Sequence, residues 1–442
     1  MIRTVLTLLA LPALVFLAAL PARADVDIQE VTSPGGLTAW LVEDHSIPFT
    51  ALRLHFAGGT SLDLPGKRGA TYLMSGLLEE GTAGMDSRDF ARAVDSLAAS
   101  FDYSAHDDTL SVDARFLTEN RAAAMDLLKG SIVAPSFPDD AVERVRQQVL
   151  SIIRGDQKDP GDIASETFDR LAFGDHPYGS SRKGTLDSVA ALTRDDIVTA
   201  HRNAFVRDRV TIGAVGDITP EELGTLLDSL LGDLPEGGAP LPPRADLTLT
   251  PGVTVIPYDT PQSEAIWGHE GIDVTDPDFF AAYVLNTILG GGSFESRMMQ
   301  EVREKRGLTY GVSTWLSDGD SAEMWKGMMA SANSRMAEAI QVVRDEWARI
   351  SAEGVTEEEL ANAKKYITGA YPLRFDGNER IASILVGMQE QGFPIDYADT
   401  RNDRVNAVTL EDVNRVAADR LRAEDLQFVV VGQPEGLETT VE

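Results

Sequence analysis

Between residues 276 and 370, apolar positions recur first at helical and then at strand-like spacing. Phe280, Val284 and Ile288 mark one face of a helix, predicted to begin at Asp276–Pro277, because an N-cap acid and an early proline favour a helix start. Glycines then end this helix. The remaining pattern predicts a helix near 296–305, strands at 308–316 and 324–329 around a turn at 317–320, and long helices near 335–351 and 357–370. Helices grouped beside strands predict an α+β fold, with mixed or antiparallel sheets covered on one side.

The chain carries one pattern twice. Thr193 and Thr409 each have an aspartate three residues later, which predicts a capping box at the start of a helix. Each predicted helix is followed by a short β-rich apolar run that stops at Gly216 or Gly432. The threonine and the glycine are equally far apart in both copies. The repeat therefore predicts two homologous α+β domains of about 200 residues each.

A segment rich in proline and glycine separates the two copies, and its composition is typical of a linker. The sequence therefore predicts four parts: an export signal at 1–24, a first domain at 25–232, a linker at 233–252 and a second domain at 253–442.

The first 24 residues have the features of a secretory signal. Arg3 supplies positive charge, the run from Val5 to Leu20 is apolar, and Ala22 and Ala24 frame a cleavage site. A membrane anchor is the alternative, but this run of about 16 residues is shorter than the roughly 20 that span a bilayer. We therefore expect an exported, periplasmic protein with no stable membrane span after signal cleavage.

Charge and residue usage narrow the classes of function. The formal net charge is −31, with 39 basic and 70 acidic residues, so the chain repels nucleic acid and no nucleic-acid partner is expected. There is no cysteine, which excludes disulfides and thiolate metal sites. No two of the six histidines stand three or four residues apart: His45, His55, His106, His176, His201 and His269. We therefore predict no metal or other cofactor in this chain.

Residues 289–312 read LGGGSFESRMMQEVREKRGLTYGV. This segment resembles the second-domain signature of the pitrilysin/insulinase (inverzincin) family of zinc peptidases, and the resemblance extends over residues 35–435. It implies that Arg303 and Tyr310 bind the carbonyl region of a peptide substrate. A guanidinium and a phenol both donate hydrogen bonds, which suits the negative charge that develops on a carbonyl oxygen during hydrolysis. The resemblance also implies that the two domains form half of a clamshell.

The zinc motif of that family is missing. Catalytic members carry His-x-x-Glu-His on a helix, with a further glutamate ligand, and the glutamate of the motif activates the attacking water. The matching segment here, residues 69–82, reads GATYLMSGLLEEGT. Thr71 and Ser75 occupy the two histidine positions, Met74 occupies the glutamate position, and the distal glutamate falls at Ile152.

We therefore predict a zinc-less auxiliary subunit of an exported heteromeric metallopeptidase, not catalytic by itself. Its expected partner is a homologous subunit that holds the zinc, in a heterodimer to which this chain contributes Arg303 and Tyr310 for peptide binding. The alternative is a non-proteolytic peptide-binding or scaffold protein of the same fold.

Overall fold

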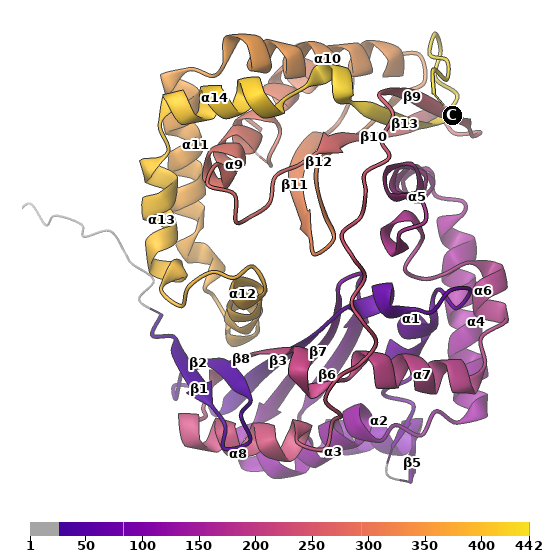
Figure 1. Cartoon of the computed structure of the whole chain (residues 1–442), viewed down its shortest axis with the longest axis vertical. Helices are drawn as coiled ribbons and strands as arrows, with labels where there is room; N and C mark the ends of the chain where they lie inside the picture. The colour runs from indigo at the N-terminus through magenta and orange to yellow at the C-terminus, as the bar shows by residue number, and fades with distance from the viewer. Residues whose placement is uncertain (1–25, 83, 293, 442) are drawn as a thin grey trace, which may run out of the picture.

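The computed structural model describes residues 26–441 apart from positions 83 and 293, and it contains two large β-sheets at opposite ends of the molecule (Figure 1). The predicted export signal, residues 1–24, lies outside the described residues. Among the helices that are described, none has both the length and the hydropathy needed to cross a bilayer.

The first sheet has six strands in the order β1-β2-β8-β3-β7-β6. Its strands are β1 (Gln29–Thr32), β2 (Thr38–Glu43), β3 (Phe49–Ala57), β6 (Ser100–Ala105), β7 (Thr109–Leu117) and β8 (Val210–Gly216). A separate small hairpin joins β4 (Gly81–Thr82) and β5 (Met85–Asp86).

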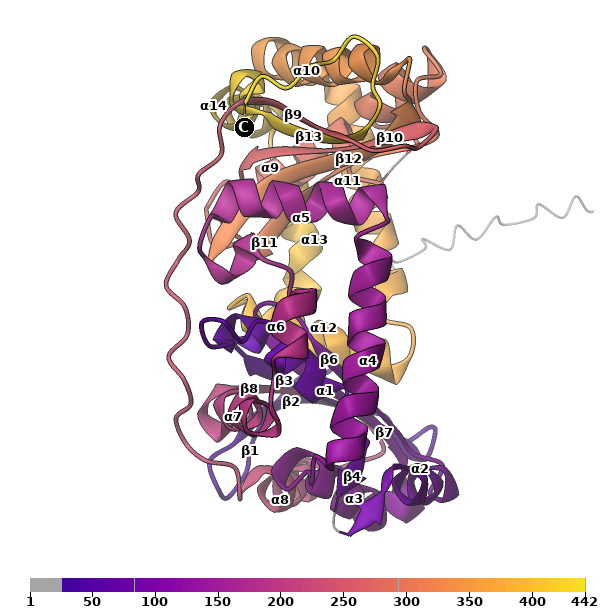
Figure 2. The same cartoon turned by 90° about the vertical axis from the view of Figure 1, so that its right-hand side faces the viewer.

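The second sheet has five strands in the order β11-β12-β10-β13-β9. Its strands are β9 (Gly252–Pro257), β10 (Gln262–Glu270), β11 (Val312–Gly319), β12 (Ala322–Ala332) and β13 (Gln427–Gly432). In Figure 2 the segment between the sheets runs as an extended trace along one side, and residues 233–251 form neither helix nor strand.

The two sheets repeat one topology. In the first, β8 pairs in parallel with β2 and antiparallel with β3. In the second, β13 pairs in parallel with β9 and antiparallel with β10. Thr193 and Thr409 close the capping boxes of the helices that precede β8 and β13. The repeat predicted from the sequence, and with it the α+β fold of two homologous units, is confirmed.

The helices of the first half are α1 (Ala70–Ser75), α2 (Ser87–Ser96), α3 (Arg121–Val133), α4 (Asp139–Asp156), α5 (Pro160–Phe173), α6 (Leu186–Ala190), α7 (Arg194–Ala204) and α8 (Pro220–Leu231). Those of the second half are α9 (Phe279–Leu289), a π-helix (Met299–Glu304), α10 (Met336–Glu353), α11 (Glu357–Ala370), α12 (Asn378–Glu390), α13 (Tyr397–Ala407) and α14 (Leu410–Arg420).

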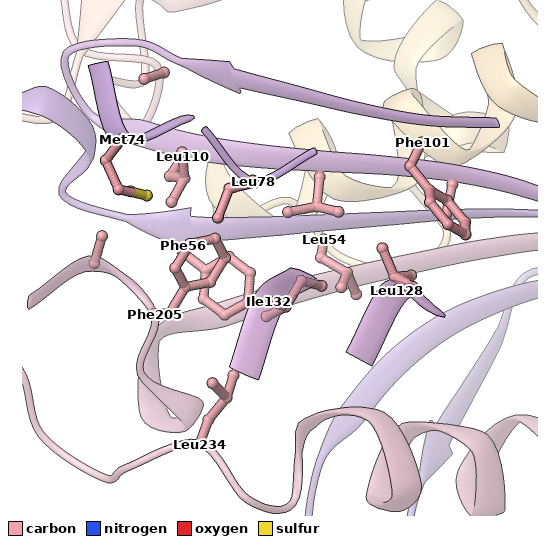
Figure 3. Close-up of a cluster of buried hydrophobic side chains, with 14 of the residues drawn as sticks. Leu54, Phe56, Met74, Leu78, Phe101, Leu110, Leu128, Ile132, Phe205 and Leu234 are labelled. Carbon is pink, nitrogen blue, oxygen red and sulfur yellow. The ribbon is translucent and has the colours of Figure 1, made fainter. Parts of the chain in front are cut away.

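The main core of the first half lies between its sheet and the helices on the outer face. Figure 3 shows Leu54 and Phe56 of β3 beside Leu128 and Ile132 of α3. The second half has an equivalent core, in which Trp267, Trp325 and Trp347 are fully buried. Burial of this many large apolar side chains drives the folding of each half.

The inner faces of the sheets are covered by exchanged helices, which corrects the expectation that helices cover one side only. From the first half, α5 packs on β10 and β13 of the second sheet through Phe168 and its neighbours. From the second half, α12 packs on β3 and β8 of the first sheet through Leu385 and its neighbours. The exchange ties the halves together, because neither sheet completes its inner face with its own half of the chain.

Glycine permits the close approach of each exchanged helix. A Cβ added at Gly213 of β8 would lie 2.7 Å from the carbonyl oxygen of Ala382 in α12. A Cβ added at Gly268 of β10 would lie 3.1 Å from the ring of Phe168 in α5. A side chain at Gly213 would collide with the backbone of α12, so only glycine allows the helix to pack this close to the strand.

Some boundaries in the second half differ from the expectation for local reasons. The first helix begins at Phe279 instead of Asp276–Pro277, because the Asp276 carboxylate accepts the N–H of Asp278 at 2.8 Å and forms a turn. Strand β11 begins at Val312 instead of residue 308 and continues through the expected turn to Gly319. The expected helix near 296–305 contains the π-helix.

Candidate functional site

Arg303 lies in the last turn of the π-helix. A π-helix has wider turns than an α-helix and is frequent at functional sites. Met299 and Val302 bury the opposite face of this helix in the core. The Arg303 guanidinium lies 5.0 Å from the ring centroid of Phe294, and its Nε is 3.6 Å from a carboxylate oxygen of Glu304. The Arg303 side chain is 33% exposed, so the guanidinium contacts Phe294 and Glu304 and is also accessible to solvent.

Glu301 engages the other cations around the π-helix. Its carboxylate is nearly buried and accepts from Lys305 at 2.6 Å and from Arg306 at 2.7 Å, and Arg349 of α10 lies 3.6 Å away. Burial alone would raise the pKa of Glu301, but the hydrogen bonds from Arg306 and Lys305 lower it, so the carboxylate stays charged. Lys305, Arg306 and Arg349 therefore share the Glu301 carboxylate, whereas Arg303 pairs with Glu304 and contacts Phe294.

Tyr310 is held outside the core by its neighbours. Thr309 is buried, and its hydroxyl contacts the carbonyl oxygens of Ala330 in β12 at 2.6 Å and of Gly311 at 2.7 Å. The same hydroxyl accepts the N–H of Gly311 at 3.0 Å. These bonds keep the segment before β11 out of the strand ladder and turn Tyr310 to solvent, where it is 87% exposed. Its hydroxyl has no hydrogen-bond partner among the described residues.

Arg303 and Tyr310 thus flank one short connection between the π-helix and β11, and both side chains are open to solvent. A cation and a phenol with free donors can bind the carbonyl oxygens of a peptide. Their role in binding substrate stays a prediction.

Thr71, at the first histidine position of the missing zinc motif, serves a structural purpose. Its N–H and hydroxyl both donate to one carboxylate oxygen of Asp63, at 2.8 and 2.7 Å. The other oxygen of Asp63 accepts the N–H of Gly69 at 2.8 Å. The aspartate therefore satisfies N–H groups at the start of α1, a use of the helix end that needs no metal.

The other positions of the missing motif carry no imidazole or carboxylate either. Met74 is fully buried in the first-half core, where Figure 3 shows it near Leu110. Ser75 donates back to the carbonyl oxygen of Tyr72 at 2.9 Å. Ile152 lies in α4 and is 42% exposed. Within residues 26–441, positions 83 and 293 aside, no three His, Asp or Glu side chains are grouped closely enough to hold a metal ion.

A second polar cluster joins the halves, and sequence analysis did not predict it. The turn between β11 and β12 reaches the first half, where the N–H of Ser321 donates to the Tyr178 hydroxyl at 3.1 Å. That hydroxyl donates to Asp108 at 2.5 Å, and the N–H of Asp320 donates to the other oxygen of Asp108 at 3.3 Å. Tyr178 belongs to the run His-Pro-Tyr-Gly at residues 176–179, which by itself does not indicate a contact with residue 321.

Acidic groups crowd this contact. Burial, and then the nearby carboxylates of Asp108, Glu390 and Asp318, raise the pKa of Asp320 to about 6. Burial, followed by Asp273, also raises the pKa of Asp318 to about 6. Beside them, a cavity of 520 Å³ is lined by residues of both halves, among them His55, Asp169 and Lys326. The cluster holds the turn between β11 and β12 against Asp108 and Tyr178 of the first half.

Comparison with known families accounts for most of the chain. Residues 39–186 match the insulinase family (peptidase family M16), and residues 191–367 match the peptidase M16 inactive domain. The chain is 26% identical over 393 residues to the non-peptidase homolog YmxG of Helicobacter pylori, covering 88% of this chain and 90% of the relative. It is 27% identical over 402 residues to an uncharacterized zinc protease of Streptomyces coelicolor, covering 89% and 87%.

Solved structures of similar proteins have the same fold. A crystal structure described as a peptidase M16 inactive domain, from Pseudomonas fluorescens, superposes with a TM-score of 0.87 at 28% identity, covering 94% of this chain and all of the other. A Helicobacter pylori protease superposes with a TM-score of 0.82 at 16% identity, covering 92% and 99%, which shows that the fold is shared.

Proposed function

Because the chain belongs to the insulinase (M16) family of peptidases but lacks the residues of its zinc site, we propose that it is the zinc-less subunit of an exported heteromeric peptidase. In this proposal a homologous subunit supplies the zinc, and the present chain contributes Arg303 and Tyr310 to bind the peptide and stabilise its carbonyl oxygen.

The observation that carries the proposal is the exposure of Tyr310. The side chain is 87% exposed, and its hydroxyl bonds to no described residue, although Thr309 beside it is anchored on two carbonyl groups. Exposed single aromatics are common, but one whose phenol is free, on the connection that follows the π-helix of Arg303, supports a binding role. Positive and hydrogen-bonding groups at this place suit the carbonyl oxygen of a peptide.

A second candidate function is a peptide-binding or scaffold role without proteolysis. The description of the Helicobacter pylori relative as a non-peptidase homolog favours it. In this case the same residues bind a peptide, but no partner cleaves it.

The test is hydrolysis of a mixed peptide library by this chain alone, by a zinc-bearing M16 subunit from the same organism, and by the mixture, each with and without chelator. We expect chelator-sensitive cleavage that is strongest in the mixture. Arg303→Ala and Tyr310→Phe are each expected to lower kcat/KM of the mixture about 10- to 100-fold, because each removes a donor to the developing charge.

Two matched controls are used. Arg92→Ala changes an exposed arginine on α2, and Tyr258→Phe removes a hydroxyl whose hydrogen bond lies in an exposed place. Neither is expected to alter the rate. A metal-loaded mixture that assembles but cleaves no peptide would refute the peptidase role, and peptide binding by that mixture would then support the second candidate.

A further inference from the structure

A cavity of 500 Å³ lies between α9, the loop after it and α11 in the second half. We call it the Phe294 pocket. It is lined by Thr287, Ile288, Gly292, Phe294, Glu295, Ser296, Glu359, Asn362, Ala363 and Tyr366. Its volume lies within the range of about 300–1,000 Å³ that is usual for pockets that bind small ligands.

Apolar and aromatic groups form most of its walls. Ile288 and Ala363 are buried, whereas Phe294 is 70% exposed and Tyr366 is 50% exposed. Two exposed aromatic side chains on different elements line one concave surface. Rings prefer to pack edge-to-face or offset against other rings, which makes such walls suitable for an aromatic guest.

The lining of the pocket includes one buried hydroxyl without a hydrogen-bond partner in the described part of the chain, that of Ser296. Ser296 is only 2% exposed, and its Oγ has no hydrogen-bond partner among the described residues. A buried hydroxyl without a partner is destabilising, because it has lost its hydrogen bonds to water and gained none in the protein. Two other polar groups of the lining are engaged, since Thr287 donates to the carbonyl oxygen of Tyr283 and Glu359 accepts from Arg297. Within the described structure, the Ser296 hydroxyl therefore lacks a partner that a polar group of a guest would supply.

Two carboxylates in the lining disfavour acidic guests. Burial disfavours the charged form of Glu359, but hydrogen bonds from Arg297 and Thr356 prevail and lower its pKa to about 2. Glu295 adds a second carboxylate to the lining. A carboxylate entering the pocket would meet these charges, whereas a neutral aromatic side chain would not.

The pocket adjoins Arg303. Phe294 forms part of its wall, and the guanidinium of Arg303 lies 5.0 Å from the centroid of the same ring. A peptide held at Arg303 therefore places one of its side chains within reach of the pocket.

We propose that the Phe294 pocket binds an aromatic side chain of the peptide, with tyrosine preferred to phenylalanine because its hydroxyl pairs with Ser296. The proposal rests on the peptide-binding function given above and names the side chain that this subunit selects. The Phe294 and Tyr366 rings supply affinity for any aromatic side chain, and Ser296 supplies the preference for a hydroxyl.

The test uses fluorescein-labelled nonapeptides of alanine and lysine with Tyr, Phe, Ala or Glu at the centre. Their binding to the full chain, alone and in the mixed complex, is measured by fluorescence anisotropy. We expect the affinity order Tyr, Phe, Ala, Glu, with Tyr about 5- to 10-fold tighter than Phe, as one hydrogen bond allows. Ser296→Ala is expected to abolish this difference without weakening the Phe peptide. Tyr366→Ala is expected to weaken the Tyr and Phe peptides but not the Ala peptide.

Two controls separate this pocket from the parent function. Arg303→Ala is expected to weaken the Tyr, Phe and Ala peptides by the same factor, and Ser96→Ala on α2 is expected to change none of them. Retained peptide binding with an unchanged Tyr-to-Phe ratio in Ser296→Ala would overturn the pocket and leave the proposed function standing. Absence of binding by every peptide would overturn both.

Direct mapping makes the result independent of variant stability. A nonapeptide with benzoylphenylalanine at the centre is photocrosslinked to the full chain, and the product is digested and sequenced by mass spectrometry. Crosslinks in α11 around Tyr366 or in the loop at Phe294 would support the proposal, and crosslinks confined to other elements would overturn it.

Discussion

The hydroxyl of Tyr178 bridges the two halves, and its removal is a direct test of how they are held together. It donates to Asp108 at 2.5 Å within the first half and accepts the N–H of Ser321 from the second half at 3.1 Å. Burial first, and then the adjacent Asp108 carboxylate, raise the pKa of Tyr178 above its usual value, so the phenol remains protonated and keeps donating.

Tyr178→Phe removes both hydrogen bonds while retaining the ring that packs on Phe173 and His176. A hydrogen bond to a charged group is worth about 1.5–3 kcal/mol and a neutral one about 0.5–1.5 kcal/mol. The site is half-buried, so water replaces part of the loss. We therefore expect the free energy of unfolding to fall by about 2 kcal/mol at pH 7.

Urea unfolding followed by tryptophan fluorescence and circular dichroism measures this loss. Four of the five tryptophans, Trp267, Trp315, Trp325 and Trp347, lie in the second half, so fluorescence reports mainly on that half while circular dichroism reports on both. We expect the two transitions to separate in Tyr178→Phe, because a weaker joint lets one half unfold before the other.

Tyr258→Phe is the matched control. Its hydroxyl also links the halves, donating to the carbonyl oxygen of Lys158 at 2.8 Å, but in an exposed place where water substitutes readily. We expect it to cost less than about 0.5 kcal/mol. Equal losses in the two variants, or no loss in Tyr178→Phe, would refute the argument that the buried bridge joins the halves.

Two further predictions concern charge and metal. The raised pKa of Asp320, about 6, means that the folded state favours the neutral acid; the stability from this effect is complete below the ordinary value of 3.8 and is lost as the pH rises through about 6. Asp320→Asn should therefore be more stable than the wild type by about 1 kcal/mol above pH 7, after a discount for solvent screening, and equally stable near pH 4. Urea titrations of both proteins at about pH 7 and about pH 4 measure this, and a stability difference that is the same at both pH values would contradict this origin. Zinc or a chelator should leave the thermal midpoint of the isolated chain unchanged, because Thr71, Met74 and Ser75 bring no imidazole or carboxylate to α1; a rise of several degrees with equimolar zinc would reveal a site built from other residues.

The sequence by itself determined the local elements and their repetition. Thr193 and Thr409 both cap helices as predicted, because their partners stand only three residues away in the chain. The family resemblance and the replacement of the zinc motif were also readable, since both depend on residue identity at fixed spacing. The same resemblance pointed to Arg303 and Tyr310, whose role stays a prediction.

Only the tertiary structure decided how these parts meet. The exchange of α5 and α12 between the sheets joins segments that are far apart in the chain. The bridge from Tyr178 to Ser321 likewise joins residues 143 positions apart. The outward position of Tyr310 depends on a bond between Thr309 and Ala330 on another strand, and the Phe294 pocket requires α11 beside the loop after α9. The local sequence determines hydrogen bonds between residues that are a few positions apart. Contacts between distant segments form only when burial of apolar surface offsets the entropy cost of closing the chain between them.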